Sequence, residues 1–380
     1  MKAKKMYAKL ILFFILAVLF LSVGDSFALR LGNVDVKLRT SASERFDDNI
    51  TYTKDNKKDD LITTATAGID VRYEGKTRLL EFTADISRQL FADNSIFDNT
   101  SRDMTLNFQN EFSKYSRINI RDSFTHADEP RSFEDALGRT SGRYSYDTNR
   151  INAEYSRDIT KQFAVLARYL NETNTYSRED LVDSTLQAAG LQAGCIISSD
   201  FNVLTSYDYA KRKFDNGAHS TIESFGAGLR KYLTKQLYLD ARGGRDFITS
   251  YSDTDYKKPS ISASLTSDID SNTTASVSYA KQYRTSSYTE DLFNYWQVSG
   301  SLTKRLLERL GFALSGYYGD GKYITSGTED KLTGSSVGFT YDIGDNMRGN
   351  LSYSYSRTDS TVDISEYTKN SVTAGVSIEF

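Results

Sequence analysis

Apolar and polar residues alternate with a period of two along most of this chain. In residues 371–380 one parity carries apolar side chains, and the other carries polar or small ones. Because successive side chains of a β-strand point to opposite faces, this stretch is predicted to be a strand with one apolar and one polar face. The apolar face comprises Val372, Ala374, Val376, Ile378 and Phe380.

This strand ends on an aromatic ring, which is unusual for a water-soluble protein because free termini tend to fray. A transmembrane strand has reason to end this way, since its lipid face must be apolar and aromatic residues belong at the membrane interface. Terminal strands of this kind resemble the sorting signal of bacterial outer-membrane barrels, which the barrel-assembly machinery reads. A soluble edge strand is the alternative for this stretch taken alone.

Short turn signals separate the alternating segments at a regular interval. Six strands are predicted to begin directly after such signals, at Phe163, Phe201, Leu237, Thr273, Leu310 and Met347. Their spacings of 38, 36, 36, 37 and 37 residues indicate one structural unit that is repeated. Each unit runs strand, longer polar loop, strand, tight turn, which is the asymmetry of an outer-membrane barrel with long external loops and short periplasmic turns.

The pattern therefore predicts an all-β fold, a transmembrane antiparallel up-and-down β-barrel of about eighteen strands. Sixteen is the alternative count, because the first strand is the weakest. An even number would place both chain ends in the periplasm. The predicted strands cover residues 34–43, 61–73, 77–90, 104–113, 117–126, 144–157, 163–173, 184–197, 201–213, 221–233, 237–250, 258–269, 273–285, 292–306, 310–323, 332–343, 347–358 and 368–380.

The face opposite the apolar one carries many charges near the middle of the strands. A dry core could not hold so many unpaired charges, whereas a water-filled lumen can. Fixed charges on a pore wall would set solute preference. A ladder of cross-strand salt bridges that only holds the wall together is the alternative role for each of them. The candidates for lining a pore are Asp70, Arg72, Glu81, Asp85, Arg117, Arg121, Glu154, Arg168, Asp208, Arg230, Asp240 and Arg242.

Composition agrees with a sheet protein that has one apolar face per strand. The chain of 380 residues is 39% hydrophobic and 13% aromatic, but it holds only two prolines and one tryptophan, with a mean hydropathy of −0.50. A helical membrane protein would be far more apolar, and a disordered chain would be poorer in aromatic residues.

Residues 1–28 are predicted to be a cleaved secretory signal peptide, followed by a barrel domain over residues 29–380. Four lysines precede an apolar core at residues 10–23, and Ser26 and Ala28 supply the small residues of a cleavage site. Without this segment, which holds four Lys and one Asp, 43 basic and 49 acidic residues remain. This balance argues against a nucleic-acid partner. The predicted location is the bacterial outer membrane, with lipid and the assembly machinery as partners.

Other candidate chemistry is weak. Cys195 lies on an apolar parity and is predicted to pack rather than react. His126 has Ser123 and Asp122 nearby in sequence, but a solvated histidine is the usual case, so no catalytic residue and no enzyme are predicted. Acidic loops at residues 47–48 with 59–60, and at 253–255, match no defined calcium loop. We therefore expect no metal and no cofactor.

The longest loop, residues 127–143, contains a helix-start pattern after Pro130. A short helix here could fold inward and constrict the pore. A surface loop lying outside the barrel is the alternative.

The start of the predicted barrel resembles a known family. Its loop contains Asp48, Asn49 and Ile50, and a later strand runs from Asp60 to a turn at residues 73–75. These residues resemble the opening of the putative β-barrel porin 2 family. The resemblance implies an outer-membrane barrel of a Gram-negative bacterium, in a family often linked to exopolysaccharide production and export.

A barrel of this size leaves an aqueous channel, so the expected function is passive or gated passage of hydrophilic solutes. The resemblance adds an association with exopolysaccharide export, with polysaccharide-export proteins as partners. The alternatives are a partner-dependent export conduit or scaffold that does not conduct by itself, and an outer-membrane enzyme.

Overall fold

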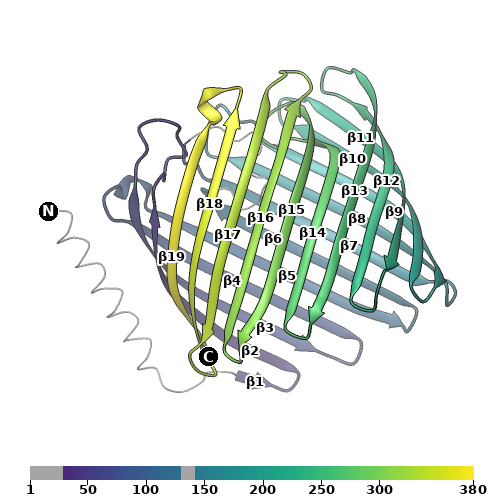
Figure 1. The fold of residues 1–380 in the computed structure, drawn as a ribbon, viewed down its shortest axis with the longest axis horizontal. Coiled ribbons are helices and arrows are strands. Elements are labelled where there is room, and N and C mark those ends of the chain that lie inside the picture. The colour runs from purple at the N-terminus through teal and green to yellow at the C-terminus, as the bar shows by residue number, and fades with distance from the viewer. Residues whose placement is uncertain (1–28, 130–141) are drawn as a thin grey trace.

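The structure is a computed structural model that describes residues 29–129 and 142–380 (Figure 1). It consists of long strands and two short 3₁₀ turns, Ser95–Phe97 and Asp363–Ser365. No helix in the described residues is long and apolar enough to cross a membrane. A short strand β1 (Leu29–Leu31) comes first. It is followed by β2 (Val34–Asp47), β3 (Asp60–Glu74), β4 (Arg78–Phe91), β5 (Asn99–Ser113), β6 (Ser116–Ala127), β7 (Tyr146–Asp158), β8 (Phe163–Tyr176), β9 (Ser184–Ser198) and β10 (Phe201–Phe214). The series continues with β11 (His219–Tyr232), β12 (Leu237–Thr249), β13 (Asp255–Asp270), β14 (Thr273–Thr285), β15 (Leu292–Leu307), β16 (Leu310–Tyr323), β17 (Glu329–Asp342), β18 (Met347–Ser360) and β19 (Tyr367–Glu379).

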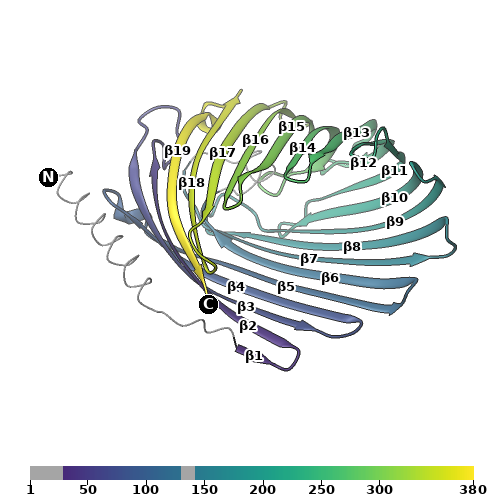
Figure 2. The same cartoon turned by 60° about the horizontal axis from the view of Figure 1, so that its bottom comes forward.

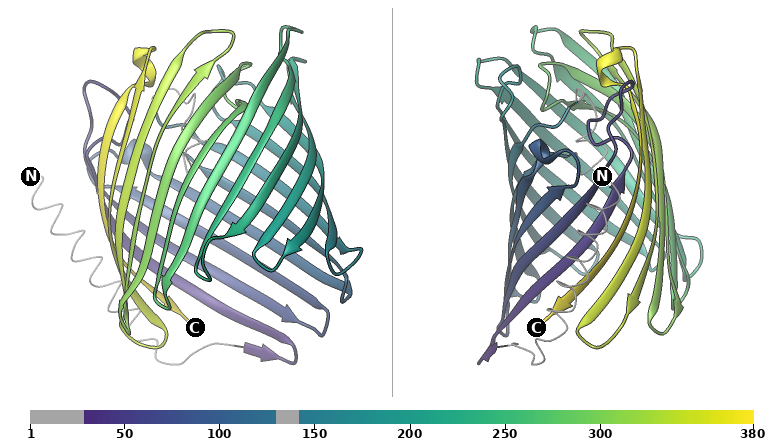
Figure 3. Two further views of the ribbon diagram at one scale, coloured as in Figure 1. Left: turned by 45° about the vertical axis from the view of Figure 1, so that its right-hand side comes forward. Right: turned by 90° about the vertical axis from the view of Figure 1, so that its left-hand side faces the viewer.

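The strands β2 to β19 form a closed antiparallel barrel. Each pairs with the next along the chain, and β19 pairs with β2 through residues 371–379 against 39–47. Two further backbone bonds join Phe380 to Leu38 at the end of this seam. The predicted barrel fold and the count of eighteen are therefore confirmed. The seam and the oblique course of the strands around the barrel can be followed in Figures 2 and 3.

Strand β1 is the addition that the sequence pattern did not predict. It pairs antiparallel with β2 through residues 34–36. The seam pairing of β19 begins only at Arg39, so β1 continues along the same edge of β2 beyond the end of β19. The first barrel strand is thus paired over its whole length, which explains why a strand that is weak in sequence pattern is still formed.

The two faces of the wall alternate consistently around the ring. The register pairs apolar residues with one another from strand to strand, as in the row Val71, Phe82 and Leu106. Large hydrophobic side chains such as Leu191, Val277 and Leu351 are more than half exposed on this face. A wall that exposes so much apolar surface is suited to lipid rather than water. The apolar face of β19 lies on the same side, because Val372 pairs with Phe46.

The two ends of the barrel differ in the length of their connections. At the end where the chain terminates, strands are joined by tight turns such as residues 159–162 and 233–236. In each of these the threonine at the start accepts two backbone N–H bonds, Thr160 from Gln162 and Phe163, and Thr234 from Gln236 and Leu237. This shared turn accounts for the repeated Thr-Lys-Gln sequence. The opposite end carries the longer loops.

Candidate functional site in the barrel interior

The interior is lined by polar side chains from strands that are far apart in the ring. One cavity, of about 940 Å³, has Arg39, Asp85 and Asp103 from β2, β4 and β5 on one side. Its other side is formed by Arg305 and Arg348 from β15 and β18. Charged groups from strands as far apart in the ring as β5 and β15 therefore border the same space, which is the arrangement of an aqueous lumen rather than a packed core.

A second cavity, of about 950 Å³, lies toward the loop end. It is bounded by β6 to β11 on one side and by residues 282–287, the end of β14 and the start of the β14–β15 connection, on the other. The loop end of the β14–β15 hairpin turns into the barrel, since Leu292 at the start of β15 is fully buried against Ile222 and Ile248 on the inner faces of β11 and β12. Tyr288 reaches Tyr176 at the end of β8, with ring centroids 5.3 Å apart. The β14–β15 loop, residues 286–291, thus narrows the mouth.

Arg212 on β10 ties the base of this loop to the wall. Its guanidinium donates to Thr285 Oγ1 at 2.9 Å, to Ser184 Oγ at 2.9 Å and to Glu172 Oε1 at 3.0 Å. Only 3% of the residue is exposed. Because an arginine fork can satisfy several acceptors in fixed directions, this contact holds both partners in place.

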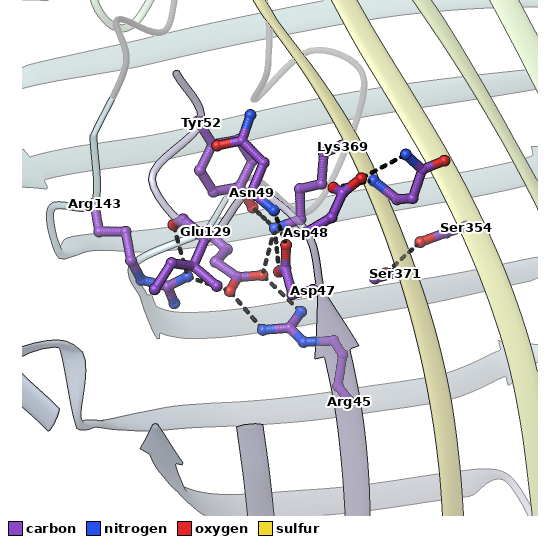
Figure 4. A network of polar contacts seen from close by, with 12 residues as sticks. Arg45, Asp47, Asp48, Asn49, Tyr52, Glu129, Arg143, Ser354, Lys369 and Ser371 are labelled. Atoms are coloured by element: carbon purple, nitrogen blue, oxygen red, sulfur yellow. Dashed lines mark hydrogen bonds and ion pairs between the residues drawn. The ribbon is translucent and has the colours of Figure 1, made fainter. Parts of the chain in front are cut away.

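A second group of charges crosses the mouth on the opposite side, at the β2–β19 seam (Figure 4). Arg45 on β2 donates two bonds to Glu129, at 2.6 and 2.8 Å. Arg143 donates to the same carboxylate at 2.6 Å, and the Lys369 ammonium lies 3.9 Å from it. Lys369 also pairs with the fully buried Asp47 at 2.8 Å. We call Arg45, Asp47, Glu129, Arg143 and Lys369 the seam network.

Electrostatics within the seam network favours the ionised carboxylate. Burial alone would raise the pKa of Glu129, but the nearby charges of Arg45, Lys369 and Arg143 outweigh it and hold this pKa well below its ordinary value. Burial also raises the pKa of Tyr52 well above its usual range. Because of this raised pKa the Tyr52 hydroxyl stays protonated at neutral pH, and it accepts a bond of 2.9 Å from Lys369.

The predicted loop at residues 127–143 takes part in this network through its two described ends. Glu129 precedes the undescribed segment and Arg143 follows it, and the Gly142 amide donates to the Thr51 carbonyl at 2.9 Å. Both ends therefore lie against the inner wall of the mouth. The helix predicted after Pro130 lies outside the described residues, as does the predicted signal peptide, residues 1–28.

The twelve candidate residues all occupy the inward parity of their strands. Eight of them form ion pairs: Asp70 and Asp85 with Arg39, Arg72 with Glu81, Arg168 with Asp208, and Arg230 with Asp240. Across residues 29–129 and 142–380, the remaining four form no ion pair; they are Arg117, Arg121, Glu154 and Arg242. Their role in conduction stays a prediction.

Two of the paired carboxylates lie over glycines of the neighbouring strand. An ideal Cβ at Gly190 would lie 2.1 Å from Asp208 Oδ1, and one at Gly68 would lie 2.0 Å from Asp85 Oδ1. These glycines leave room for the carboxylates to lie flat on the wall, where Asp208 meets Arg168 at 2.8 Å. Any side chain at either position would displace the carboxylate.

Sequence reasoning missed Arg45, Glu172, Arg212 and Lys369, although the same signal could have found them. Each has the inward parity of its strand, and each lies near the loop end rather than at mid-strand. The alternation pattern predicted pore-lining charges near mid-strand, and these four lie beyond that region. Alternation carries no information on contacts made by loops that fold inward.

The weaker candidates have structural contacts instead. His126 Nδ1 lies 2.5 Å from Asp147 Oδ1 on the outward face, whereas Ser123 points inward and donates to the Arg150 carbonyl at 3.3 Å. The structure thus does not bring Ser123 to His126. The acidic loop residue Asp60 accepts the backbone amides of Asp93 and Asn94. No cluster of three His, Cys, Asp or Glu suited to a metal occurs in the described part of the chain.

The closed ring, the apolar exterior and the charged interior define a β-barrel of the outer-membrane type. The family model described as putative beta-barrel porin 2 matches residues 259–380 of this chain, which confirms the predicted resemblance to that family. The match covers the C-terminal third. The motifs at residues 48–75 that first indicated the family lie outside it.

Solved structures agree with the fold. The crystal structure of Pseudomonas aeruginosa OccK2 (OpdF) aligns with a TM-score of 0.52 and 11% identity, over 92% of this chain and 98% of that one. The same protein in complex with glucuronate gives a TM-score of 0.51, also at 11% identity, with the same coverage. Acinetobacter baumannii OccAB3 gives 0.50 at 11% identity, over 92% of this chain and 100% of that one. No curated protein matches the sequence.

Proposed function

We propose that this chain forms a pore in the outer membrane of a Gram-negative bacterium and passes hydrophilic solutes. The observation that supports this most directly is the 940 Å³ cavity, which is bordered by charged groups of β2, β4 and β5 and of β15 and β18. Such groups need water, and an eighteen-strand barrel is wide enough to contain it. In this proposal the barrel acts as a channel rather than as an enzyme.

The mouth is proposed to be the narrow part of the pore. The β14–β15 loop enters it on one side, and the seam network holds Glu129 and Arg143 across it on the other. Solutes entering from the loop end would pass the 950 Å³ cavity, with Arg150 and Glu154 on its wall. The inward fold of the β14–β15 loop supports this site as the constriction.

The unpaired charges of the wall suggest a mild preference for anions. Arg117, Arg121 and Arg242 are balanced only by Glu154. The eight other candidates lie in ion pairs, in which Asp70 and Asp85 share Arg39 and keep one net negative charge. A charge already paired at short range contributes little field to a passing ion, so the unpaired groups would dominate selectivity.

The test is conductance of the purified mature protein in planar bilayers, with reversal potentials in a salt gradient and liposome swelling with sugars of increasing size. Stepwise conductance with a swelling cutoff supports the pore. A barrel that inserts into the bilayer but neither conducts ions nor passes small sugars would contradict the proposed pore function. Replacing Arg121 and Arg242 with Gln should shift the reversal potential toward cation preference.

A second candidate is a conduit for exopolysaccharide that opens only with partner proteins. It is favoured by the two inward-folded segments, which narrow the mouth of the isolated chain, and by the family resemblance. The glucuronate bound by the Pseudomonas aeruginosa barrel adds an acidic sugar as the kind of solute to try first. Copurification with periplasmic export proteins, together with a silent channel in bilayers, would favour this candidate over the free pore.

Export and assembly belong to the same proposal. Cleavage after Ala28 would begin the mature chain at Leu29, the first residue of β1, and β19 would present the assembly signal ending in Phe380. N-terminal sequencing of the protein from outer-membrane fractions tests the first step. Loss of insertion on replacing Phe380 with Ser tests the second.

A further inference from the structure

The outer surface of the barrel changes character at the loop end of strands β10 to β14. Apart from Lys231 at the turn end of β11, which pairs with Asp200, the outward row of each strand is apolar or small from the turn end up to residues such as Tyr209, Phe225 and Tyr279. The next outward residue is then charged. On four of the five strands it is a cation, and the residues are Lys211, Arg245, Lys257 and Lys281, with Glu223 on β11. Lys213 adds a further cation on β10.

These cations form no ion pairs within the described part of the chain, and all are exposed. The Lys257 ammonium lies over the Phe247 ring, 5.6 Å from its centre, and the residue is exposed. The rim of β16 to β18 is different. There Lys322 pairs with Glu329, and Arg357 pairs with Asp359 at 2.7 Å. Glu223 and Asp255 are the acidic side chains on the outward rows of β10 to β14, so the five cations leave an excess of positive charge on this rim.

The position of these cations matches a membrane interface. On β12, Leu237 and Arg245 are eight residues apart, which corresponds to a height of roughly 20 Å for a strand tilted by about 40°. This is close to the height of the apolar band of a barrel. Aromatic residues at the same level, Tyr209 and Trp296, are typical of the interfacial girdle. The ammonium and guanidinium groups thus lie at the depth of lipid head groups.

We propose that the loop-end rim of β10 to β14 binds the phosphate groups of the glycolipid in the outer leaflet, that is, lipopolysaccharide. Interfacial lysine and arginine clusters attract anionic lipid, and arginine forms strong charge-assisted bonds with phosphate. Side chains that only snorkel toward water would explain single lysines but not four unpaired cations on neighbouring strands. This inference rests on the proposed function, because it requires the barrel to be oriented in the outer membrane with its loop end outside the cell.

The test uses the full mature protein in detergent and measures the lipid A retained, by native mass spectrometry, against phosphatidylethanolamine as the neutral background. The variant is the triple substitution R245Q/K257Q/K281Q. Its matched control is K322Q/K331Q/R357Q, which removes one Arg and two Lys from the rim of β16 to β18. We expect retention of lipid A to fall by about tenfold or more in the first variant and by less than twofold in the control.

Three outcomes would overturn the proposal: equal retention by both variants, equal retention of lipid A stripped of its phosphates, or equal retention of phosphatidylglycerol and lipid A. Should the triple variant fail to fold, the single substitutions Lys257→Gln and Lys281→Gln carry the same comparison. Bilayer conductance of each variant is recorded separately. These residues lie on the outer wall, so unchanged conductance with unchanged lipid binding rejects this inference and leaves the pore intact.

Discussion

Two sets of ion pairs in the barrel use the same residue types in different surroundings. The seam network is buried, with 2% of the Arg143 side chain and 15% of the Glu129 side chain exposed. The pair Arg230–Asp240 stands in the open lumen with side chains 45% and 30% exposed. An exposed pair contributes about 0–1 kcal/mol, whereas removing one partner from a buried pair costs about 3–5 kcal/mol. Burial, rather than the distance between partners, therefore separates structural charges from those available to a solute.

The largest effect is expected for Glu129→Ala. Three cations, Arg45, Arg143 and Lys369, would lose the carboxylate that they share, at a cost of about 3–5 kcal/mol to this network. Amide hydrogen exchange at residues 48–53 and 142–146 should accelerate, and single-channel conductance should rise. Asp240→Asn serves as the exposed control. Unchanged exchange in the Glu129 variant would mean that the seam network does not hold the loop ends.

Arg212→Ala comes next. It breaks the tie between the β14–β15 loop and the wall and leaves Glu172 without its buried partner, a loss of about 1.5–3 kcal/mol for a charge-assisted bond. Conductance is expected to increase and to become noisier as residues 286–291 move. Arg212→Lys keeps the charge but cannot reach three acceptors, so it should rescue only part of the effect. Full rescue by lysine would show that charge alone is needed.

Acidification tests the same network more gently. The pKa of Glu129 is lower when the loop ends are docked on the wall than when they are released, so the docked state binds fewer protons. The electrostatic contribution of Glu129 to docking is therefore fully present above the ordinary glutamate pKa of about 4.3. It is lost as the pH falls through the lower folded pKa. Conductance should therefore be constant between pH 5 and 8 and rise only below about pH 4. The Glu129→Gln variant should lack this acid transition, and a wild-type-like transition in it would assign the effect elsewhere.

The smallest effect on stability is expected for Arg230→Gln. Because this pair is exposed to the lumen, the thermal unfolding midpoint should change by less than the equivalent of about 1 kcal/mol. Asp240 would become an unpaired charge on the wall, so the reversal potential should move slightly toward cation preference. A stability loss comparable to that of Glu129→Ala would erase the distinction between the two sets of pairs.

Sequence reasoning predicted the fold well because each strand carries its own signal. Alternation correctly predicted that Val372 and Phe82 lie on the apolar outward face. The interval between turns predicted strand starts at Phe163 and Leu237, which are the first residues of β8 and β12. The inward parity of the twelve candidates follows from the same alternation. Alternation does not predict which side chains pair with one another across the lumen. Arg212 meeting Thr285, and Arg45 meeting Glu129, depend on loops that carry no periodic pattern.

The amino-acid order therefore predicted most of the strands and the two faces of the wall, because a period of two is a local property of the backbone, whereas the choice of eighteen over sixteen barrel strands came from the folded ring. Only the tertiary structure decided which inward charges are neutralised and which remain open to water. It also decided that the β14–β15 loop enters the mouth. The reason is physical: the strength of an ion pair depends on burial and on the approach of residues distant in the chain, and both exist only once the ring has closed.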